Sequence, residues 1–417
     1  IPNPQSPIPN PHSKGNIVQF KFEKYKMNIA NINSLIYRSS YDLNSNLKNI
    51  SKNNFMFRLL TDDVYINLTV GSPPQVINTI WNMNQYSFKI YSSSYNENNS
   101  NTFKKISENF LYSFDEVKNA IRCEDEFYFV GEKNNIIKSP FKFVKIYENK
   151  NYSFIGLQLP DITTENLLTF IKAMKSNDII DKYIFYIIYD QNEERIDSPN
   201  GIIYFGDYPH NNEVLKDKYK KDNFIEIKVA KRKKLAYWDI LFDNVYFNKS
   251  FNKYNINKKQ VELNGNMQLS IGTDEYQEFI KTNFFNKYIK DNICEEKTIL
   301  NYTDYIYYKC SKNIDITNFP TIYFEIKEIN FNFSLNYNDL FFIHDEFYYF
   351  GIVFDKYFKL KFDQRWKLGA SLFKKYLLVF NQDSKTIGFY NNIINNNKGI
   401  NNKGINNKNI IEPNNNI

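Results

Sequence analysis

The sequence predicts a mainly β protein that is divided into two lobes. The chain has 417 residues, which is more than the roughly 250–300 residues that one hydrophobic core usually organises. It contains 33 Tyr and 37 Phe but only 13 Gly and 13 Pro, and aromatic residues favour strands. Hydrophobic residues make up 42% of the sequence, which is enough to form a core.

The N-terminal region has two parts that we expect to lie outside the lobes. Residues 1–15 are rich in proline and are predicted to be extended or disordered. Residues 16–55 form an N-terminal extension, in which the alternation from Ile17 to Lys26 predicts an amphipathic strand with basic residues on one side. Because the chain starts at Ile1 rather than Met, we expect that a signal sequence was removed and that the protein enters the secretory pathway or is secreted.

The charge and the histidines indicate neither a nucleic-acid partner nor a metal. The net charge is +7, and its densest run is Lys231–Lys234. A basic run between two β-patterned segments is typical of a solvated hairpin tip, and no nucleic-acid-binding module accompanies it. The histidines, His12, His210 and His344, have no ligand spacing, so we expect no metal and no cofactor. No stretch of about 18 apolar residues predicts a transmembrane segment.

Several segments follow one another in an order that resembles the pepsin-like aspartic protease family. The first, Val64–Trp81, is similar to the family's strand, Gly-x-Pro-x-Gln turn and second strand leading into Asp-Thr-Gly. Others resemble the end of the N-terminal lobe, the crossing between lobes and three segments of the C-terminal lobe: Phe154–Pro160, Phe185–Tyr189 with Gly201–Gly206, Tyr237–Ile240, Phe319–Phe324, and Trp366–Phe373 with Ile387–Phe389. Together they span roughly residues 56–391.

The resemblance implies a bilobed β-rich fold with a central cleft and a few short helices. We expect residues 56–195 to form the N-terminal lobe and residues 196–392 the C-terminal lobe of a monomer. The strand from Ile17 to Lys26 resembles the prosegment strand of pepsin-type zymogens, so residues 16–55 are expected to be either prosegment-like or a plain N-terminal extension. The Asn-rich tail, residues 393–417, is placed outside the domain because it has too little apolar surface to fold. The composition is similar to that of plasmepsin-type members.

Asparagine stands at both positions where the family carries a catalytic aspartate, Asn82 and Asn264. Aspartic proteases activate a water between two carboxylates that share one proton. A carboxamide donates and accepts hydrogen bonds but does not take up a proton in the working pH range. General acid–base catalysis, worth about 10²–10⁴-fold, is then lost. We therefore expect no functional catalytic residue at this site.

The residues after the two asparagines also differ from the family. Members carry Thr or Ser next, whose hydroxyl ties the two loops together, and then Gly. Here the pairs are Met83–Asn84 and Gly265–Asn266, so neither loop can make the hydroxyl link. We interpret Asn82 and Asn264 as the result of drift in an Asn-rich chain after catalysis was no longer required.

Two further expectations rest on the resemblance. Cys294 and Cys310 stand where similar proteins close a disulfide in the C-terminal lobe, while Cys123 has no evident mate and is expected to be a reduced, buried residue on a strand. Three cysteines alone leave the redox compartment open. Tyr112 stands where the family has its flap tyrosine, but the Gly-Thr-Gly of the flap is replaced by Ser113–Asp115.

These observations leave more than one class of function open. The first is a catalytically inactive pepsin-like protein, a pseudoprotease that binds an extended peptide or a protein partner in the cleft by strand pairing. The second is an active aspartic endopeptidase with atypical site residues. A carbohydrate-binding or inhibitor-type relative fits the same residues as the first. Fold alone does not decide between them.

Overall fold

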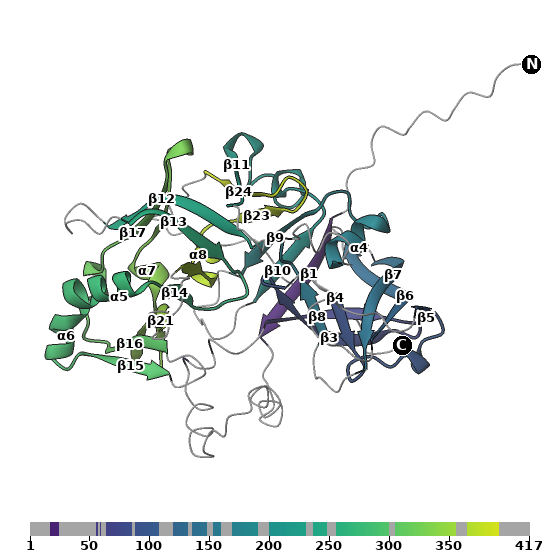
Figure 1. The fold of residues 1–417 in the computed structure, drawn as a ribbon, viewed down its shortest axis with the longest axis horizontal. Coiled ribbons are helices and arrows are strands. Elements are labelled where there is room, and N and C mark those ends of the chain that lie inside the picture. Colours follow the sequence, from purple (N-terminus) through teal and green to yellow (C-terminus); the bar gives the residue numbers. More distant parts are fainter. Residues whose placement is uncertain are drawn as a thin grey trace, which may run out of the picture.

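The computed structural model is mainly β, with a few short helices, as the sequence predicts. It describes residues 17–24, 56, 59, 64–85, 88–107, 120–131, 136–147, 153–159, 169–190, 200–230, 237–247, 256–299, 305–355 and 365–391. Residues 1–15, most of the predicted extension 16–55, His12, Tyr112, the basic run 231–234 and the tail 393–417 lie outside these ranges. Two large sheets account for the strands (Figure 1).

The first sheet has 13 strands in the order β11-β24-β23-β9-β10-β1-β2-β3-β8-β4-β7-β6-β5. Most of these strands come from the first half of the chain. The bounds are β1 Val18–Lys24, β2 Val64–Val70, β3 Gln75–Asn82, β4 Phe88–Tyr91, β5 Lys104–Ser107, β6 Ala120–Gly131, β7 Ile136–Ile146, β8 Ser153–Gly156, β9 Ile184–Tyr189, β10 Gly201–Phe205, β11 Phe224–Lys228, β23 Leu378–Asn381 and β24 Thr386–Tyr390. The C-terminal strands β23 and β24 thus return to the sheet of the first half.

The second sheet has 11 strands in the order β18-β17-β12-β13-β22-β14-β21-β16-β20-β19, with β15 paired to β16. All of them lie in the second half of the chain. The bounds are β12 Asp239–Phe247, β13 Ile256–Leu263, β14 Ser270–Gly272, β15 Cys294–Ile299, β16 Tyr305–Ser311, β17 Ile322–Ile326, β18 Phe331–Leu335, β19 Phe341–His344, β20 Phe347–Phe350, β21 Ile352–Asp355 and β22 Trp366–Leu368. This sheet and its helices occupy the left of Figure 1, and β1 to β8 the right.

The described helices are all short. They are α4 Phe170–Ser176, α5 Asp274–Ile280, α6 Asn286–Lys290, α7 Tyr337–Leu340 and α8 Ala370–Lys375, with a π-helical turn, η4 Lys281–Phe285, between α5 and α6. Single 3₁₀ turns are η1 Glu97–Asn99, η2 Pro209–Asn211, η3 Lys221–Asn223, η5 Ile316–Asn318 and η6 Lys327–Ile329. None of the helices in the described ranges is long and apolar enough to cross a membrane.

The two sheets repeat one pattern of strand connections. In the first sheet β3 runs parallel to β8, β8 antiparallel to β4, and β4 parallel to β7. In the second sheet β13, β22, β14 and β21 follow each other with the same directions. The chain visits the strands in the same order both times. The loop after β3 and the loop after β13 therefore hold equivalent places in the two halves.

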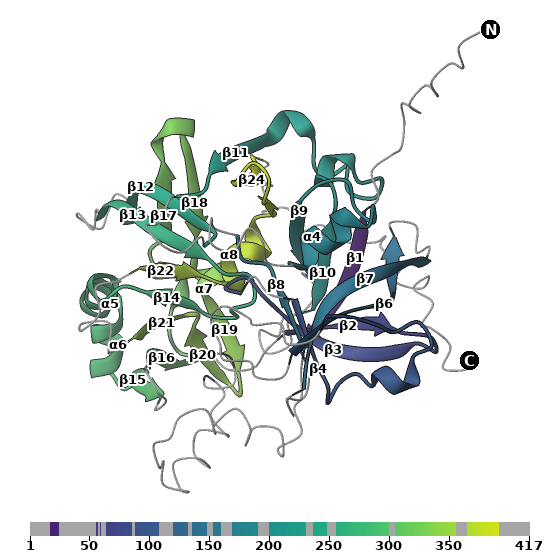
Figure 2. The same ribbon diagram turned by 45° about the vertical axis from the view of Figure 1, so that its right-hand side comes forward.

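Strand β1 lies inside the first sheet rather than at its edge. It pairs with β10 from Val18↔Phe205 to Phe22↔Gly201, and with β2 from Phe22↔Ile66 to Lys24↔Val64. The alternation from Ile17 to Lys26 predicted this strand, and Val18 is fully buried while Gln19 is half-buried. Figure 2 shows β1 running between β10 and β2.

Aromatic side chains fill the core. Trp81, Trp238 and Trp366 are fully buried. The indole of Trp238 donates a hydrogen bond of 2.7 Å to the carbonyl of Leu157, so the second half of the chain is anchored to the first near the ends of β8 and β12. Phenylalanine is the most frequent residue type in the main core cluster, which agrees with the abundance of Phe in the sequence.

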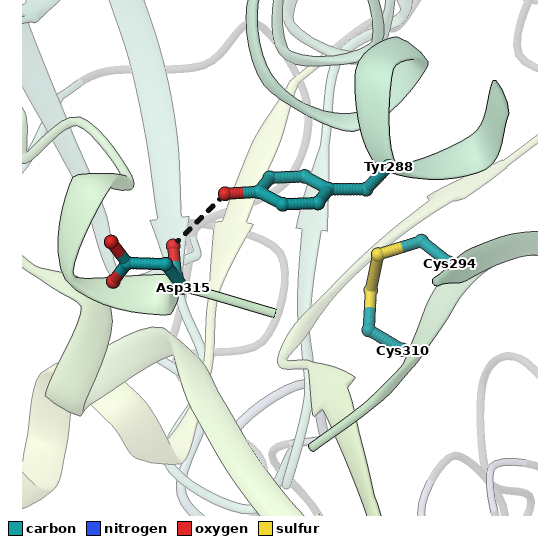
Figure 3. Close-up of a disulfide and its surroundings, with 4 residues drawn as sticks. All are labelled: Tyr288, Cys294, Cys310 and Asp315. Carbon is teal, nitrogen blue, oxygen red and sulfur yellow. Dashed lines mark hydrogen bonds between the residues drawn. A yellow bond between two sulfur atoms is a disulfide. The ribbon is translucent and has the colours of Figure 1, made fainter. Parts of the chain in front are cut away.

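The predicted disulfide is present. Cys294 and Cys310 stand opposite each other in the β15–β16 pair and are joined by an S–S bond of 2.08 Å. Beside them the Tyr288 hydroxyl of α6 donates to the carbonyl of Asp315 at 3.4 Å (Figure 3). Cys123 is a free thiol buried on β6, and burial raises the pKa of that thiol.

Candidate functional site

The first candidate loop begins at Asn82, where β3 ends. Asn82 stands opposite Gly156 in the parallel β3–β8 ladder, and its carbonyl accepts from the N–H of Leu157 at 2.8 Å. Its side-chain Oδ1 accepts from the N–H of Asn84 at 2.7 Å, the hydrogen bond of an Asx turn. Asn82 is half-buried. The carboxamide oxygen of Asn82 is therefore already used to shape the loop.

The second candidate loop begins at Asn264, directly after β13. Its N–H donates to the carbonyl of Leu368 at 3.0 Å, and its carbonyl accepts from the N–H of Met267 at 3.1 Å. Asn264 is buried, and its side-chain Oδ1 has no hydrogen-bond partner among the described residues. Gln268 in the same loop is also buried, and neither of its side-chain polar atoms has a partner in the part of the chain that the structure describes. The side chains of this loop are therefore less engaged by the described residues than those of the first loop.

The two loops are tied directly to each other. The N–H of Met83 donates to Asn266 Oδ1 at 3.2 Å, and the N–H of Gly265 donates to the sulfur of Met83 at 3.0 Å. A third bond, of 3.1 Å, runs from Asn84 Nδ2 to Glu262 Oε1. The hydroxyl link of the pepsin-like family cannot form with these residues, but a carboxamide oxygen and a thioether sulfur connect the same two loops. Sequence reasoning missed this connection, because residue type alone does not mark Met83 or Asn266 as a link.

Gly265 lies in a closely packed place between segments. A Cβ on this residue would lie 2.8 Å from Ile187 Cδ1 and 2.9 Å from Phe373 Cε1. The Tyr189 hydroxyl donates to the carbonyl of Gly265, and burial raises the pKa of Tyr189, so this hydroxyl stays a donor at neutral pH. A Thr or Ser at position 265 would have to displace Ile187 and Phe373.

The carboxylates nearest to the loops belong to a buried ionic network. Glu262 and Asp239 stand opposite each other in the β12–β13 pair and are both buried. Arg365 Nη1 lies 3.4 Å from Asp239 Oδ2 and 4.0 Å from Glu262 Oε2. Gln260 Nε2 donates to Asp239 Oδ2 at 2.6 Å. The arginine and two carboxamides thus lie against these carboxyl groups as cation and hydrogen-bond donors.

The structure brings the sequence-predicted residues Asn82 and Asn264 into one connected site. Tyr112, the expected flap residue, lies outside the described residues. Glu262 and Gln268 were not singled out from the sequence. Both are polar residues close to Asn264 in a segment that is otherwise rich in apolar residues, and this pattern could have marked them as members of the site.

In the described ranges no group of three His, Cys, Asp or Glu side chains could hold a metal. His210 stacks on Tyr208 and its Nδ1 lies 2.8 Å from the hydroxyl of Tyr390. His344 pairs with Asp345 at 3.1 Å. His210 lies in η2 against Phe224 of β11 and Tyr390 of β24, and His344 lies on β19, so neither belongs to the loops at Asn82 and Asn264.

No protein-family model matches the sequence, and no curated protein matches it.

Proposed function

We propose that this chain is a degenerate pepsin-like protein of two lobes that does not cleave peptides and instead binds an extended peptide or protein partner between its lobes. The observation that carries the proposal is the pair of connected loops at Asn82 and Asn264. They stand at equivalent places in two halves with the same strand connections. Duplicated halves that meet at paired loops agree with the motif order that resembles the pepsin-like family.

The chemistry of the connected loops supports binding rather than hydrolysis. Five carboxamides lie in or next to the loops: Asn82, Asn84, Asn264, Asn266 and Gln268. A carboxamide gives donors and an acceptor but has no proton to exchange at physiological pH. The nearby carboxylate of Glu262 accepts from Asn84 and lies beside Arg365, so it is placed as a structural acceptor. None of the five carboxamides meets the requirement of a general base with a tunable pKa.

The same groups suit the backbone of an extended peptide. Peptide N–H and C=O groups alternate along a strand, and neutral donors and acceptors match them without the desolvation cost of a charge. Asn82, Asn84 and Asn266 are half-buried, so they lie near the surface of the site. The disulfide and the lack of a membrane-crossing helix among the described ones are compatible with a protein of the secretory pathway, which is where we place it.

The test combines cleavage and binding on one preparation. We expect no cleavage of a peptide library between about pH 3 and 7, the range of a carboxylate dyad, with pepsin as the positive control. Pepstatin-sensitive cleavage by a preparation free of other proteases would establish the active endopeptidase instead.

The binding arm uses a displayed library of extended peptides and two matched variants. Asn84→Ala removes a carboxamide at the junction of the loops, whereas Asn78→Ala removes an exposed one from the same strand region, on β3. Peptides selected by the wild type should bind Asn84→Ala about tenfold more weakly, since one hydrogen bond near a charged group is worth about 1.5 kcal/mol, and Asn78→Ala unchanged. Equal loss in both variants, or the absence of any selected peptide, would contradict the proposal.

A further inference from the structure

His210 joins turn η2 to the end of strand β24. Its backbone N–H donates to the Tyr390 hydroxyl oxygen at 3.2 Å, and its ring Nδ1 lies 2.8 Å from the same oxygen. Tyr390 stands opposite Phe224 in the β11–β24 pair, at the edge of the first sheet (Figure 1). Because both contacts meet at one hydroxyl, that oxygen fastens the segment between β10 and β11 to the end of β24.

One arrangement of protons satisfies both side chains. Tyr390 is 5% exposed, and burial raises the pKa of its hydroxyl, so the phenol keeps its proton. The hydroxyl oxygen accepts the backbone N–H of His210, and its own O–H then donates to Nδ1. A neutral imidazole accepts at Nδ1 when its proton is on Nε2. The contact is therefore complete while the imidazole is neutral.

Among the described residues, the charges around the imidazole cancel. Two cations and two carboxylates face it from the neighbouring segments: Lys182, Asp207, Lys221 and Glu226. Lys182 Nζ lies 2.6 Å from Asp207 Oδ1. Glu226 Oε1 accepts from the Tyr208 hydroxyl at 3.2 Å and from the Thr386 hydroxyl at 3.0 Å. Both carboxylates are thus already engaged, and a positive charge on His210 would add to a balanced set.

Aromatic rings enclose the imidazole. It stacks on Tyr208 with ring centroids 5.1 Å apart, and it meets Phe224 edge-on at 5.3 Å. The face of a tyrosine stabilises a cation, but Lys182 Nζ already lies 5.3 Å from the centroid of the Tyr208 ring. Burial in these surroundings lowers the pKa of His210 below its usual 6.5.

We propose that His210 and Tyr390 form an acid-sensitive clasp, which is closed while the imidazole is neutral and releases η2 from the end of β24 on acidification. Protonation turns Nδ1 into a second donor to the Tyr390 oxygen, so the hydroxyl proton loses its acceptor and a charge enters the aromatic surroundings. The inference is independent of the proposed binding function.

The sign of the pH dependence follows from the lowered pKa of His210. The folded state binds this proton less tightly than the unfolded state does. The stability that the clasp contributes is therefore fully present above about pH 6.5, and it is lost as the pH falls through the lower pKa of the folded state.

The first measurement is an NMR titration of the imidazoles, which is tractable because the chain has 3 histidines. His210 is assigned by comparison with His210→Asn, whose carboxamide oxygen is an acceptor that does not titrate. We expect His210 to titrate below about pH 6.5 and to carry its proton on Nε2 at neutral pH. Titration at or above that pH, or a proton on Nδ1 at neutral pH, would overturn the inference.

The second measurement is amide hydrogen exchange on the full chain between about pH 5 and 7.5, corrected for the intrinsic effect of pH. The amides of His210 and Asn391 report on the clasp, because they donate to the Tyr390 hydroxyl and to the Asn223 carbonyl. Leu157, whose amide donates to the Asn82 carbonyl, is the remote control. Loss of one neutral hydrogen bond should lower the protection of the two reporters by about two- to tenfold at the acid end, with Leu157 unchanged.

Variants separate the clasp from general effects of acid. His210→Asn should show no such loss of protection, because its side chain does not titrate. His344→Asn removes a histidine on β19 and should keep the full loss. If His210→Asn does not fold, Tyr390→Phe removes the same bond, and its His210 amide should be poorly protected at every pH. No loss in the wild type, or an equal loss in the wild type and a folded His210→Asn, would refute the clasp.

Discussion

Replacing Asn264 by aspartate places a carboxyl group where the described residues provide no donor for it. Asn264 is only 2% exposed, and its Oδ1 has no hydrogen-bond partner within the described ranges. Asn82 is the matched control, because it holds the equivalent place in the first half, is half-buried, and already accepts the N–H of Asn84 at 2.7 Å. The two single variants thus add the same charge to two sites that differ in burial and hydrogen bonding.

The sizes of the two effects follow from these surroundings. Burial disfavours the charged form and raises the pKa of a carboxyl, by up to about 3–5 units for fully buried groups. A rise of about two to three units in Asn264→Asp lowers the free energy of unfolding at neutral pH by about 3–4 kcal/mol. In Asn82→Asp the backbone N–H favours the carboxylate, so the change should stay within about 1 kcal/mol.

The pH dependence has a definite sign. In Asn264→Asp the pKa of the introduced carboxyl in the folded state lies above its unfolded value of about 3.9, so the folded state binds the proton more tightly. The penalty is absent below about pH 4, grows as the pH rises, and is complete above about pH 7. Melting temperatures of the wild type, each single variant and the double variant between about pH 3.5 and 7.5 measure it.

The double variant also tests the site chemistry. We expect no peptidase activity, because Met83, Gly265 and Asn266 still set the loop geometry and a misplacement of about 1 Å can cost on the order of 100-fold in rate. The reasoning on burial is refuted if Asn264→Asp loses no more stability at neutral pH than Asn82→Asp, or if its loss persists at pH 4. Robust cleavage by the double variant alone would show that the loop geometry is still that of an enzyme.

Three further predictions concern the surroundings of the site and the core. Met83→Leu keeps the apolar volume but removes the sulfur that accepts the N–H of Gly265. It should lower the free energy of unfolding by about 1 kcal/mol, and Met83→Ala should lower it by about 2–5 kcal/mol. Chemical unfolding measures both, and a Met83→Leu variant as stable as the wild type would argue against the sulfur contact. Cys294→Ala/Cys310→Ala should lower the free energy of unfolding by about 3 kcal/mol. Cys123 should react with thiol reagents only after unfolding, because it is buried. Rapid labelling of Cys123 in the native protein would contradict this. Burial lowers the pKa of Lys145 from 10.5 to about 8, so the folded state holds this proton less tightly than the unfolded state does. The wild type should therefore gain stability relative to Lys145→Met as the pH rises from about 8 to 10.5. A stability difference that does not change across that range would show that the ion pair with Glu97 offsets the effect of burial.

The sequence was sufficient for the features that depend on local pattern. Alternating apolar residues predicted the strand that begins at Val18, and the aromatic content predicted a β-rich core. The pairing of Cys294 with Cys310 also came out as expected, although it was inferred from a resemblance rather than from the residues. The two-lobed pepsin-like assignment itself stays a proposal.

The sequence by itself determined which chemical groups stand at the site, since Asn82 and Asn264 have no proton to exchange wherever the chain places them. Only the tertiary structure decided how those groups are held. The contacts of Met83 with Gly265 and Asn266 join residues more than 180 positions apart, and the docking of Met56 and Leu59 depends on a sheet built from residues far along the chain. Such contacts depend on which faces two distant segments present to each other after folding, and no local periodicity encodes that.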